Sequence, residues 1–503
     1  MRRLLVHLLL FVFASPALAE TFTAGPGDDV ESLINTLEPG DELVLDDGTY
    51  TLDGSRFSFD LTGTEAMPIV IRAAEGARPH FHRPNASQNI WDIRAEHVVI
   101  RGIAFSGGSA GLRFESGRFV TIEGCEIFDT GDVALRMNDG GQRYEGMRIL
   151  RNEIHHTNGT GEGMYLGCNS NGCQLADSLI EGNYIHHTNQ SSVSQGDGIE
   201  IKEGSFGNVV RDNVIHDTNY PCILTYATAG NGGPNVIERN VMWGCGDHAI
   251  QSAADATIRN NLILGAVGAG IAMQPHQAGT PSNLVVVHNT ILNAGNPVAL
   301  RGATGSVVIA NNALYTGGGT SLFTNGDTSM LVSVGNVGNG SGPGVGAGSI
   351  AADLVMASLG GAPPMNLFPR ADGALAGAGD AAHVPSDDFD GVARGGVADV
   401  GAYALAGDEP DWAIEEGFKD PTSAPMPGTD AGVGDPDAGM VLGDASVPPG
   451  DAAVGRDAGA RVDGGGGTTD EGDGGCGCRV VRADARSLVP FFAMLVLAWR
   501  RRR

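Results

Sequence analysis

The stretch ILRNEIHHT at residues 149–157 recurs as IEGNYIHHT at 180–188 and as VRDNVIHDT at 210–218. Fainter copies continue this register in both directions. Aligned on the asparagine, the column reads Cys125, Asn152, Asn183, Asn213, Asn240, Asn261, Asn289 and Asn312, with steps of 21 to 31 residues. A repeat of that length accommodates three short strands and their corners, which is one coil of a β-solenoid.

Other columns share this register. Two residues after the asparagine, the sequence carries Ile127, Ile154, Ile185, Ile215, Met242, Ile263, Ile291 and Leu314. We expect these side chains to stack inside the coil as its apolar core. The asparagines are expected at a tight corner, where Asn tolerates left-handed geometry and its amides bond along a ladder. A further column comprises Thr130, Thr157, Thr188 and Thr218.

These columns predict an all-β fold, a single-stranded right-handed parallel β-helix, over residues 20–406. An antiparallel sandwich also contains many short strands, but it gives no reason for Asn, Ile and Thr to recur together. We expect a capping region at 20–75, which includes a short amphipathic helix at 28–37. Regular coils are expected from about 90 to 315, and irregular C-terminal coils with a closing element at 316–406. Hydrophobic residues make up 42% of the chain, enough for one long core.

The first 19 residues read as a secretory signal. Arg2 and Arg3 precede an apolar stretch at 4–14, and Ala17-Leu18-Ala19 forms a small-residue cleavage motif. The alternative, a first transmembrane helix, requires a longer apolar run. The sequence therefore predicts an exported protein that is cut before Glu20.

The C-terminal part has a different composition. Residues 407–475 are rich in Asp, Gly, Ala and Pro, as in DAG at 430–432, and predict a disordered acidic stalk. The net charge of −28 excludes nucleic-acid binding, which requires a basic face.

Residues 476–503 combine Cys476-Gly477-Cys478, an apolar stretch at 488–499 and a terminal Arg cluster. This segment resembles the C-terminal sorting signals of myxobacteria. The resemblance implies that the apolar helix is removed and the cysteine region modified for anchoring at the cell surface. The alternative is a simple membrane tail with its Arg cluster inside the cell.

Export makes the cysteines candidates for disulfides. Cys168 and Cys173 bracket a short loop and predict a local disulfide. Cys222 and Cys245 lie about one repeat apart, so they are either bonded or merely stacked. Cys125 is expected to be a small buried hydrophobic residue.

The N-terminal region carries a family resemblance. PGDELVLDDGTY at 39–50 and GTEAMPIVIRA at 63–73 resemble polysaccharide lyases of the chondroitinase B and alginate lyase group, within the pectate-lyase-like superfamily. DDFDG at 387–391 and DVGAY at 399–403 resemble the closing element of secreted bacterial β-helix proteins. The first resemblance implies a polysaccharide groove, a Lys base, an assisting Arg one coil later and often calcium. The Arg has no match here, because that coil offers Tyr226 instead.

Stacked coils place one candidate site on neighbouring strands. Aligning Gly161–Gly167, Gly196–Lys202 and Tyr220–Tyr226 puts Glu200 and Lys202 on one strand between Tyr165 and Tyr226. The same alignment assigns Leu135 and Ile250 to the column of Glu200. Lys202 is predicted to be the general base of a lyase acting on an acidic polysaccharide, with Glu200 and Tyr226 beside it. The predicted substrate-binding residues are Tyr165, Asp197, Arg301 and His248. The alternative reading is a solvated surface ion pair on a non-catalytic glycan-binding protein.

Two further groups of residues could carry chemistry. His155, His186 and His216 share one column, and His156, His187 and Asp217 share the next, which makes the latter three candidate metal ligands. The alternative is that identical rings stack only because their shapes match. A column of acids, Glu162, Asp197 and Asp247, could support hydrolysis by paired carboxylates. No cofactor is required by the sequence, although calcium fits the resemblance, and a monomer is expected.

Overall fold

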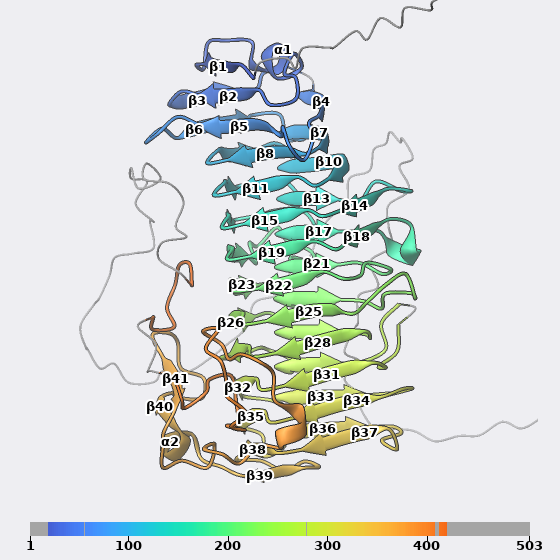
Figure 1. Ribbon diagram of the computed structural model, residues 1–503, viewed down its shortest axis with the longest axis vertical. Helices are drawn as coiled ribbons and strands as arrows, with labels where there is room; N and C mark the ends of the chain where they lie inside the picture. The colour runs from blue at the N-terminus through green and yellow to red at the C-terminus, as the bar shows by residue number, and fades with distance from the viewer. Residues whose placement is uncertain (1–18, 55, 278, 408–411, 420–503) are drawn as a thin grey trace, which may run out of the picture. The chain divides into compact units, whose positions relative to one another are not determined.

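The computed structural model describes residues 19–54, 56–277, 279–407 and 412–419, all within one compact unit. Three parallel sheets run along a stack of coils, and each coil contributes one strand to each sheet (Figure 1). Parallel strands joined by crossovers of the usual hand give a right-handed helix of coils. The predicted right-handed parallel β-helix is therefore confirmed.

The three sheets are called A, B and C in chain order. Sheet A contains β1 (Thr21–Ala24), β2 (Glu42–Leu45), β5 (Ile69–Ala73), β8 (Val98–Arg101), β11 (Thr121–Glu123), β15 (Arg148–Leu150), β19 (Leu179–Glu181), β22 (Val209–Arg211), β25 (Asn235–Glu238), β28 (Ala256–Arg259), β31 (Leu284–Val287), β34 (Val307–Ala310) and β37 (Leu331–Val334). Sheet B contains β3 (Gly48–Thr51), β6 (Pro79–Arg83), β9 (Ala104–Gly107), β12 (Glu126–Phe128), β16 (Glu153–His155), β20 (Tyr184–Thr188), β23 (Val214–Thr218), β26 (Val241–Cys245), β29 (Leu262–Ile263), β32 (Thr290–Asn293), β35 (Ala313–Thr316), β38 (Asn336–Gly338) and β39 (Val345–Ala347).

Sheet C contains β4 (Ser58–Thr62), β7 (Trp91–Glu96), β10 (Leu112–Arg118), β13 (Leu135–Met137), β17 (Met164–Leu166), β21 (Ile199–Ile201), β24 (Ile223–Thr225), β27 (Ile250–Ser252), β30 (Ile271–Met273), β33 (Val298–Arg301) and β36 (Leu322–Asn325), with β14 (Arg143–Glu145) and β18 (Gln174–Ala176) beside it. The remaining elements are α1 (Val30–Ile34), α2 (Ile350–Asp353), an antiparallel pair β40 (Leu354–Met356) and β41 (Asn366–Pro369), and short 3₁₀ turns at Asn169–Asn171 and Ala381–His383.

The asparagine column forms a continuous ladder at the corner between sheets A and B. Each Nδ2 donates to the Oδ1 of the next asparagine, from Asn152 to Asn336, at 2.9 to 3.0 Å. The backbone N–H groups of the same residues donate to those oxygens. Side-chain amides thus satisfy buried groups that the turn leaves unpaired.

The asparagines do not adopt the left-handed conformation expected from the sequence. The residue before each asparagine does so instead, as at Arg151 (φ 53°), Asp212 (φ 57°) and Asn260 (φ 55°). The ladder asparagine must direct its amide along the stack, and the left-handed turn just before it provides the change of direction.

The predicted core columns are confirmed. Ile154, Ile185, Ile215 and Met242 pair in register on sheet B and are fully buried. Thr157, Thr188 and their column mates are also buried, and their hydroxyls donate to backbone carbonyls at 2.5 to 2.8 Å. Burial of an apolar side chain in every coil stabilises the stack by about 1.5–3 kcal/mol for each large residue.

Helix α1 covers the first coil, as expected. Asp29 caps it by accepting a hydrogen bond from the backbone of Ser32 at 3.1 Å. Val30 and Ile34 are buried against the core of the coils. The helix therefore shields the strands of the first coil from other chains.

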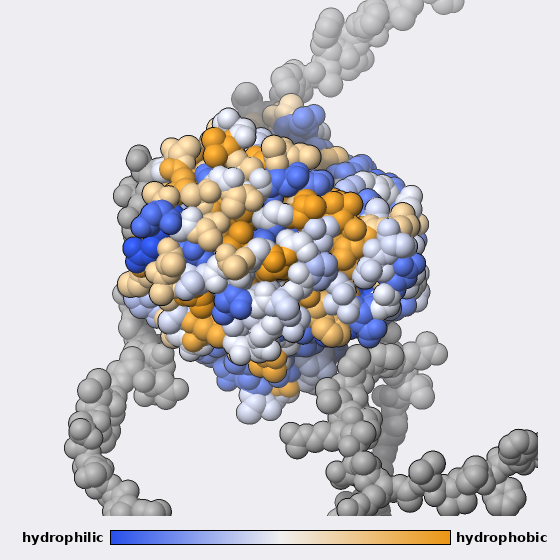
Figure 2. All heavy atoms as spheres, turned by 90° about the horizontal axis from the view of Figure 1, so that it is seen from below, coloured by the Kyte–Doolittle hydropathy of each residue, from blue (hydrophilic) through white to orange (hydrophobic). Residues whose placement is uncertain are grey.

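Regular coils continue beyond residue 315, where the sequence predicted an irregular region. The ladder extends to Asn336, and β36, β37 and β38 add a further coil. The many glycines in this region obscure the apolar repeat in the sequence, but the backbone pairing between strands continues. The end of the stack carries separate hydrophobic spots between hydrophilic residues (Figure 2). Met330 and Val332, beside and in the last strand of sheet A, are exposed.

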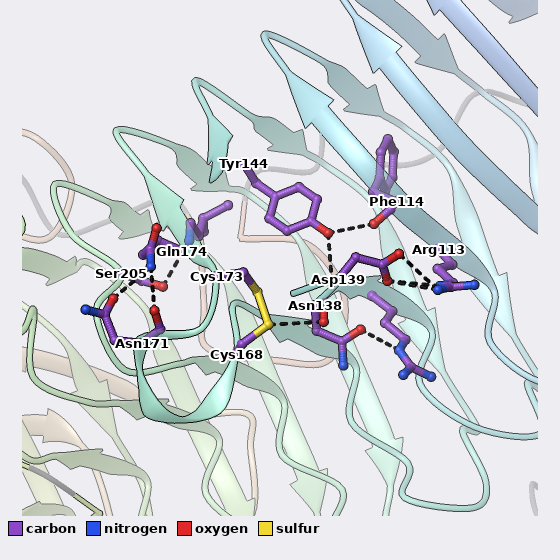
Figure 3. The surroundings of a disulfide bond; sticks show 12 residues. Arg113, Phe114, Asn138, Asp139, Tyr144, Cys168, Asn171, Cys173, Gln174 and Ser205 are labelled. Atoms are coloured by element: carbon purple, nitrogen blue, oxygen red, sulfur yellow. Dashed lines mark hydrogen bonds and ion pairs between the residues drawn. A yellow bond between two sulfur atoms is a disulfide. The ribbon is translucent and has the colours of Figure 1, made fainter. Parts of the chain in front are cut away.

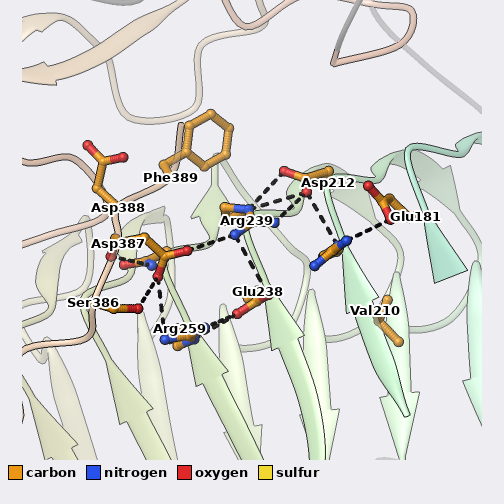
Figure 4. A network of polar contacts seen from close by, with 12 residues as sticks. Glu181, Val210, Asp212, Glu238, Arg239, Arg259, Ser386, Asp387, Asp388 and Phe389 are labelled. Atoms are coloured by element: carbon orange, nitrogen blue, oxygen red, sulfur yellow. Dashed lines mark hydrogen bonds and ion pairs between the residues drawn. The ribbon is translucent and has the colours of Figure 1, made fainter. Parts of the chain in front are cut away.

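The closing element returns along the side of the coils. The carboxylate of Asp387 forms ion pairs with Arg239 at 2.9 Å and with Arg259 at 3.5 Å (Figure 4). The two arginines belong to successive coils. Arg394 is buried and donates to Asn260 and to two carbonyls of its own segment. The element thus covers the outer face of sheet B and the corner between sheets A and B, where Phe389, Ala402 and Tyr403 lie in one apolar cluster with residues of several sheet B strands.

Residues 412–419 fell within the predicted stalk, but they pack against the coils. Ile414 is buried and pairs with Met365, and Lys419 donates to Asp212 at 2.6 Å. The signal segment at 1–18, residues 420–475 of the predicted stalk and the anchor at 476–503 lie outside the described residues. Within the described residues, no helix is long and apolar enough to cross a membrane.

Replacing Asn213 by Ala tests the ladder. The change removes the Oδ1 that accepts from the backbone N–H and the Nδ2 of Asn183, and it removes the Nδ2 that donates to Asn240. We expect a loss of about 3 kcal/mol in the free energy of unfolding, measured in urea, because buried polar groups lose their partners. The exposed Asn325→Ala serves as control, with an expected change within about 0.5 kcal/mol. An equal effect of both variants would contradict the ladder's role.

Candidate functional site

The predicted site lies on the outer face of sheet C. Ile199 and Ile201 point into the core, so Glu200 between them points outward. Tyr165 precedes Glu200 in its column, and Leu224 follows it. The sequence alignment was wrong for two coils. There Arg136 and Gln251 occupy the column, whereas Leu135 and Ile250 face inward, because the corners after Gly131 and Gly246 are one residue longer.

Lys202, Glu200 and Tyr226 form one hydrogen-bonded cluster. The Nζ of Lys202 donates to Oε1 of Glu200 at 2.7 Å, and the hydroxyl of Tyr226 donates to the same oxygen at 2.9 Å. Nζ also lies 4.6 Å from the ring centroid of Tyr165 and 5.1 Å from that of Tyr226. The side chains of Lys202 and Glu200 are 5% and 2% exposed. The cluster is thus closed to solvent in this conformation.

His276 covers the cluster and was not found from the sequence. Its ring stacks on Tyr226 with centroids 5.0 Å apart, and its Nε2 lies 3.2 Å from the Tyr226 hydroxyl. His276 follows β30, two coils beyond Tyr226, in a loop outside the repeat. No periodic signal marks such a contact.

Three carboxylates converge behind the cluster. Glu162, Asp197 and Glu200 each place one oxygen within 4.8 Å of the others, and all three are buried. Within the described residues, both oxygens of Glu162, Oδ1 of Asp197 and Oε2 of Glu200 make no hydrogen bond. Asp247, expected in this column, is replaced there by His248.

Burial determines the charge state of these acids. Burial, with the nearby Glu200 adding to it, raises the pKa of Glu162 to about 7. Burial and the charges of Glu200 and Glu162 hold the pKa of Asp197 well above its usual range. Such a triad retains protons at neutral pH or binds a cation. Unpaired carboxylate oxygens are the donors that calcium prefers, so Glu162, Asp197 and Glu200 fit the calcium that the lyase resemblance implies.

The environment of Lys202 favours its charged form. Burial acts to lower its pKa, but the charge of Glu200, the neighbouring Tyr165 and the hydrogen bond to Glu200 outweigh it, so the pKa is raised. A lysine that acts as a general base needs a lowered pKa, so the raised pKa opposes the predicted role. In this conformation Lys202 therefore carries its proton, and it can act as a base only once the charge of Glu200 is balanced.

Disulfide-bonded loops border sheet C. Cys168 and Cys173 are bonded, as predicted, and close a loop beside sheet C (Figure 3). Gln277, next to His276, donates to Asn169 of this loop at 3.0 Å. Cys222 and Cys245, left open by the sequence, are also bonded, and Cys125 is a buried free thiol, as expected.

The other predicted substrate-binding residues lie in a separate group. Gln274 links His248 (3.5 Å) with Arg301 (3.2 Å) further along sheet C. Arg301 also lies over the ring of Phe323. The structure brings Tyr165 and Asp197 to Lys202, but it places His248 and Arg301 in this second group.

Comparison with known proteins agrees with the coil architecture. A family model described as "Right handed beta helix region" matches residues 79–193 and 163–314. These coils are a right-handed β-helix region. No curated protein matches the sequence.

Three solved structures illustrate the range of similarity. Pectate lyase Pel9A is 15% identical, with a TM-score of 0.48, covering 76% of this chain and 96% of its own. An alginate lyase from Paenibacillus sp. str. FPU-7 is 20% identical, with a TM-score of 0.39 and coverages of 53% and 99%. XylC in complex with xylose is 9% identical, with a TM-score of 0.47 and coverages of 76% and 98%. Similarity at this level assigns no chemistry to this chain.

The triad predicts an unusual pH dependence of stability. The pKa of Glu162 is raised from 4.5 to about 7 in the folded state, so the folded protein binds the extra proton between these values. Stability should therefore fall as the pH rises from about 4.5 to 7, by up to about 3 kcal/mol for this group. Urea unfolding of Glu162→Gln should show a smaller decline than the wild type, and identical pH profiles would contradict the assignment.

Proposed function

We propose that this protein is a β-eliminating lyase of an acidic, uronate-containing polysaccharide, with Lys202 as the general base. The observation that carries the proposal is a buried lysine on the outer face of sheet C that donates to Glu200, a member of a buried carboxylate triad in which four oxygens make no hydrogen bond to the described residues. Elimination needs a base for the C5 proton of a uronide and positive charge near its carboxylate.

The choice of lysine at this position supports a role in proton transfer. The sequence holds 31 lysines and arginines, of which only Lys202 and Lys419 are lysines. Arginine serves nearly every other ion pair, and it cannot give up its proton at accessible pH. A lysine is required where the side chain must lose and regain a proton. Lys419, in contrast, is tied to Asp212 and to the carbonyl of Phe389.

Each residue of the cluster has a separate role in the elimination. Lys202 removes the proton at C5, the electron pair forms the C4–C5 double bond, and the C4–O4 bond breaks. The hydroxyl of Tyr226 stands where it can return a proton to O4; burial raises the pKa of Tyr226, so it keeps that proton until it is needed. A calcium ion held by Glu162, Asp197 and Glu200 would offset part of their negative charge and attract the uronide carboxylate.

A cation that offsets the charge of Glu200 would also lower the pKa of Lys202. Glu200 is the neighbour that most strongly raises the pKa of Lys202, while burial acts in the opposite direction. Removing that charge leaves burial to lower the pKa towards the working range of a base. The stack of His276 on Tyr226 must also open before a sugar can reach the cluster.

A non-catalytic glycan-binding protein is the second candidate. The observation in its favour is the nearly complete burial of the Lys202–Glu200 pair, which is also what a purely structural ion pair shows. The aromatic rings and the Arg301–Gln274 group would then form a sugar-binding surface along sheet C.

Export and surface anchoring remain part of the proposal. Two disulfides suit an oxidising compartment outside the cytoplasm. The segment around Cys476 and Cys478 would hold the protein at the cell surface. Cell fractionation of a chain truncated after Gly475 tests this, with release into the medium expected. Retention equal to that of the intact chain would refute the anchor.

Two substitutions at Lys202 test the base. Alginate, pectate and chondroitin are offered to the wild type, and the unsaturated uronide is followed by its ultraviolet absorbance. Lys202→Ala should remove the product, and so should Lys202→Arg, which keeps the charge but cannot lose a proton. The expected loss is about 10²–10⁴-fold. Activity retained in Lys202→Arg would exclude a base role, and a wild type inactive on all three polymers would favour the glycan-binding protein.

Glu200→Gln provides an independent test through pH. The change removes the charge that raises the pKa of Lys202, so the rate profile measured without added calcium should shift to lower pH. The control is Glu145→Gln at the exposed Arg143, which should leave the profile unchanged.

A further inference from the structure

Two columns of ring side chains line the end of sheet B, away from the Lys202 cluster. In the inner column, His155, His186 and His216 stack with centroids 4.9 and 5.4 Å apart. In the outer column, the rings of His156 and His187 stack at 4.9 Å, and Asp217 takes the next place. The coil spacing thus brings six polar side chains together on three consecutive coils.

The inner histidines use their two nitrogens in different ways. Each Nε2 faces a group on the preceding coil, namely Glu126 for His155 (3.4 Å), Glu153 for His186 (3.3 Å) and the Tyr184 hydroxyl for His216 (2.9 Å). Each Nδ1 faces the outer side chain of its own coil, namely His156 (2.6 Å), His187 (2.7 Å) and Asp217 (2.7 Å).

This pattern orients the inner rings as metal ligands are oriented. In His155 and His186, an Nε2–H that donates to a carboxylate leaves Nδ1 with a lone pair directed outward. In His216, Nδ1–H donates to Asp217, so a metal ion would replace that proton. At 2.6 to 2.7 Å, two facing Nδ1 atoms must share a proton, which is the place that a cation can take.

Ring stacking alone does not account for these contacts. Phe128 and Trp243 continue the inner column at 5.3 and 4.4 Å without facing a nitrogen outward. Matching ring shapes therefore explain why the inner rings stack. They do not explain why the outer histidines and Asp217 face the Nδ1 atoms of the inner rings. His187 (φ 54°) and Asp217 (φ 51°) also hold left-handed corners, where the next coil uses Gly244. This conformation is less favourable for histidine than for glycine.

We propose that His187, His216 and Asp217 bind one divalent first-row transition ion of the zinc type. One ligand atom from each lies within 4.8 Å of the other two. Two imidazoles and a carboxylate form a donor set that such ions prefer over calcium. The oxygen-only triad at Glu162 suits the opposite class of ion, so the two sites differ in selectivity.

The site needs only a modest adjustment. Ligands of a tetrahedral zinc lie about 3.3 Å apart. Ligand atoms here are at most 4.8 Å apart, so His187 must move closer, whereas Nδ1 of His216 and Oδ2 of Asp217, at 2.7 Å, must separate slightly. His216 is fully buried and held by Tyr184, whereas the side chain of Asp217 is 40% exposed and His187 is half-buried. His187 and Asp217 can therefore adjust their positions around a metal ion held by the fixed His216. A coordination position on the outer side then stays open to solvent.

Titration of the untagged, metal-free full chain tests the site. Zinc binding is followed by calorimetry and cobalt binding by its visible spectrum, with calcium in a separate arm. We expect one zinc ion per chain, a tetrahedral cobalt spectrum and a higher melting temperature with zinc. His187→Asn and Asp217→Asn, which both suit a left-handed corner, should weaken zinc binding by at least about 10-fold.

A matched control comes from the same chain. His97 also has a left-handed backbone (φ 51°) and stacks its ring on Phe119, so His97→Asn removes an equivalent ring elsewhere. It should leave zinc affinity unchanged, as should Glu162→Gln, and calcium binding should survive in His187→Asn. No saturable zinc binding, or equal affinity in His187→Asn and His97→Asn, would overturn the proposal.

Discussion

The amide hydrogen bond from one asparagine to the next is the interaction on which the rest of the structure depends. It repeats from Asn152 to Asn336 at nearly constant length and fixes the corner between sheets A and B. Since that corner is superimposed from coil to coil, residues at the same place in the repeat stack directly. The repeat in the sequence therefore becomes a set of columns in space.

Stacking has a chemical consequence, because it concentrates like groups. Apolar residues in one column form the core, but acids or histidines in one column lie about 4.8 Å apart. Glu162 and Asp197 illustrate the cost: among the described residues, both oxygens of Glu162 and Oδ1 of Asp197 find no hydrogen-bond partner, and burial raises the pKa of each acid. Columns of ionisable groups therefore tend to bind protons or cations. The donor atoms in the column determine which cation is preferred.

Variation enters where the corners are not constrained by the ladder. The connections on both sides of sheet C differ in length from coil to coil and hold the Cys168–Cys173 loop and His276. Loops positioned by a rigid scaffold commonly carry function. On sheet B, by contrast, Phe389 and Tyr403 of the returning chain pack against outward-facing residues of several coils, so this face is covered.

The sequence alone determined the features that repeat. Asn, Ile and Thr columns, the fold, the capping helix and the Cys168–Cys173 disulfide followed from period and local spacing, because each depends on a residue and its neighbour one coil away. The neighbourhood of Lys202, Glu200, Tyr165 and Tyr226 followed for the same reason.

Only the tertiary structure decided what does not repeat. The places of Arg136 and Gln251 depend on corners one residue longer, which a fixed alignment misses. His276 reaches Tyr226 from a loop two coils away, and Lys419 meets Asp212 across 207 residues. Such contacts arise from chain paths with no period, and whether Lys202 is charged depends on burial and on the groups that surround it in space. A periodic sequence specifies its stacked neighbours, but the three-dimensional packing determines the rest.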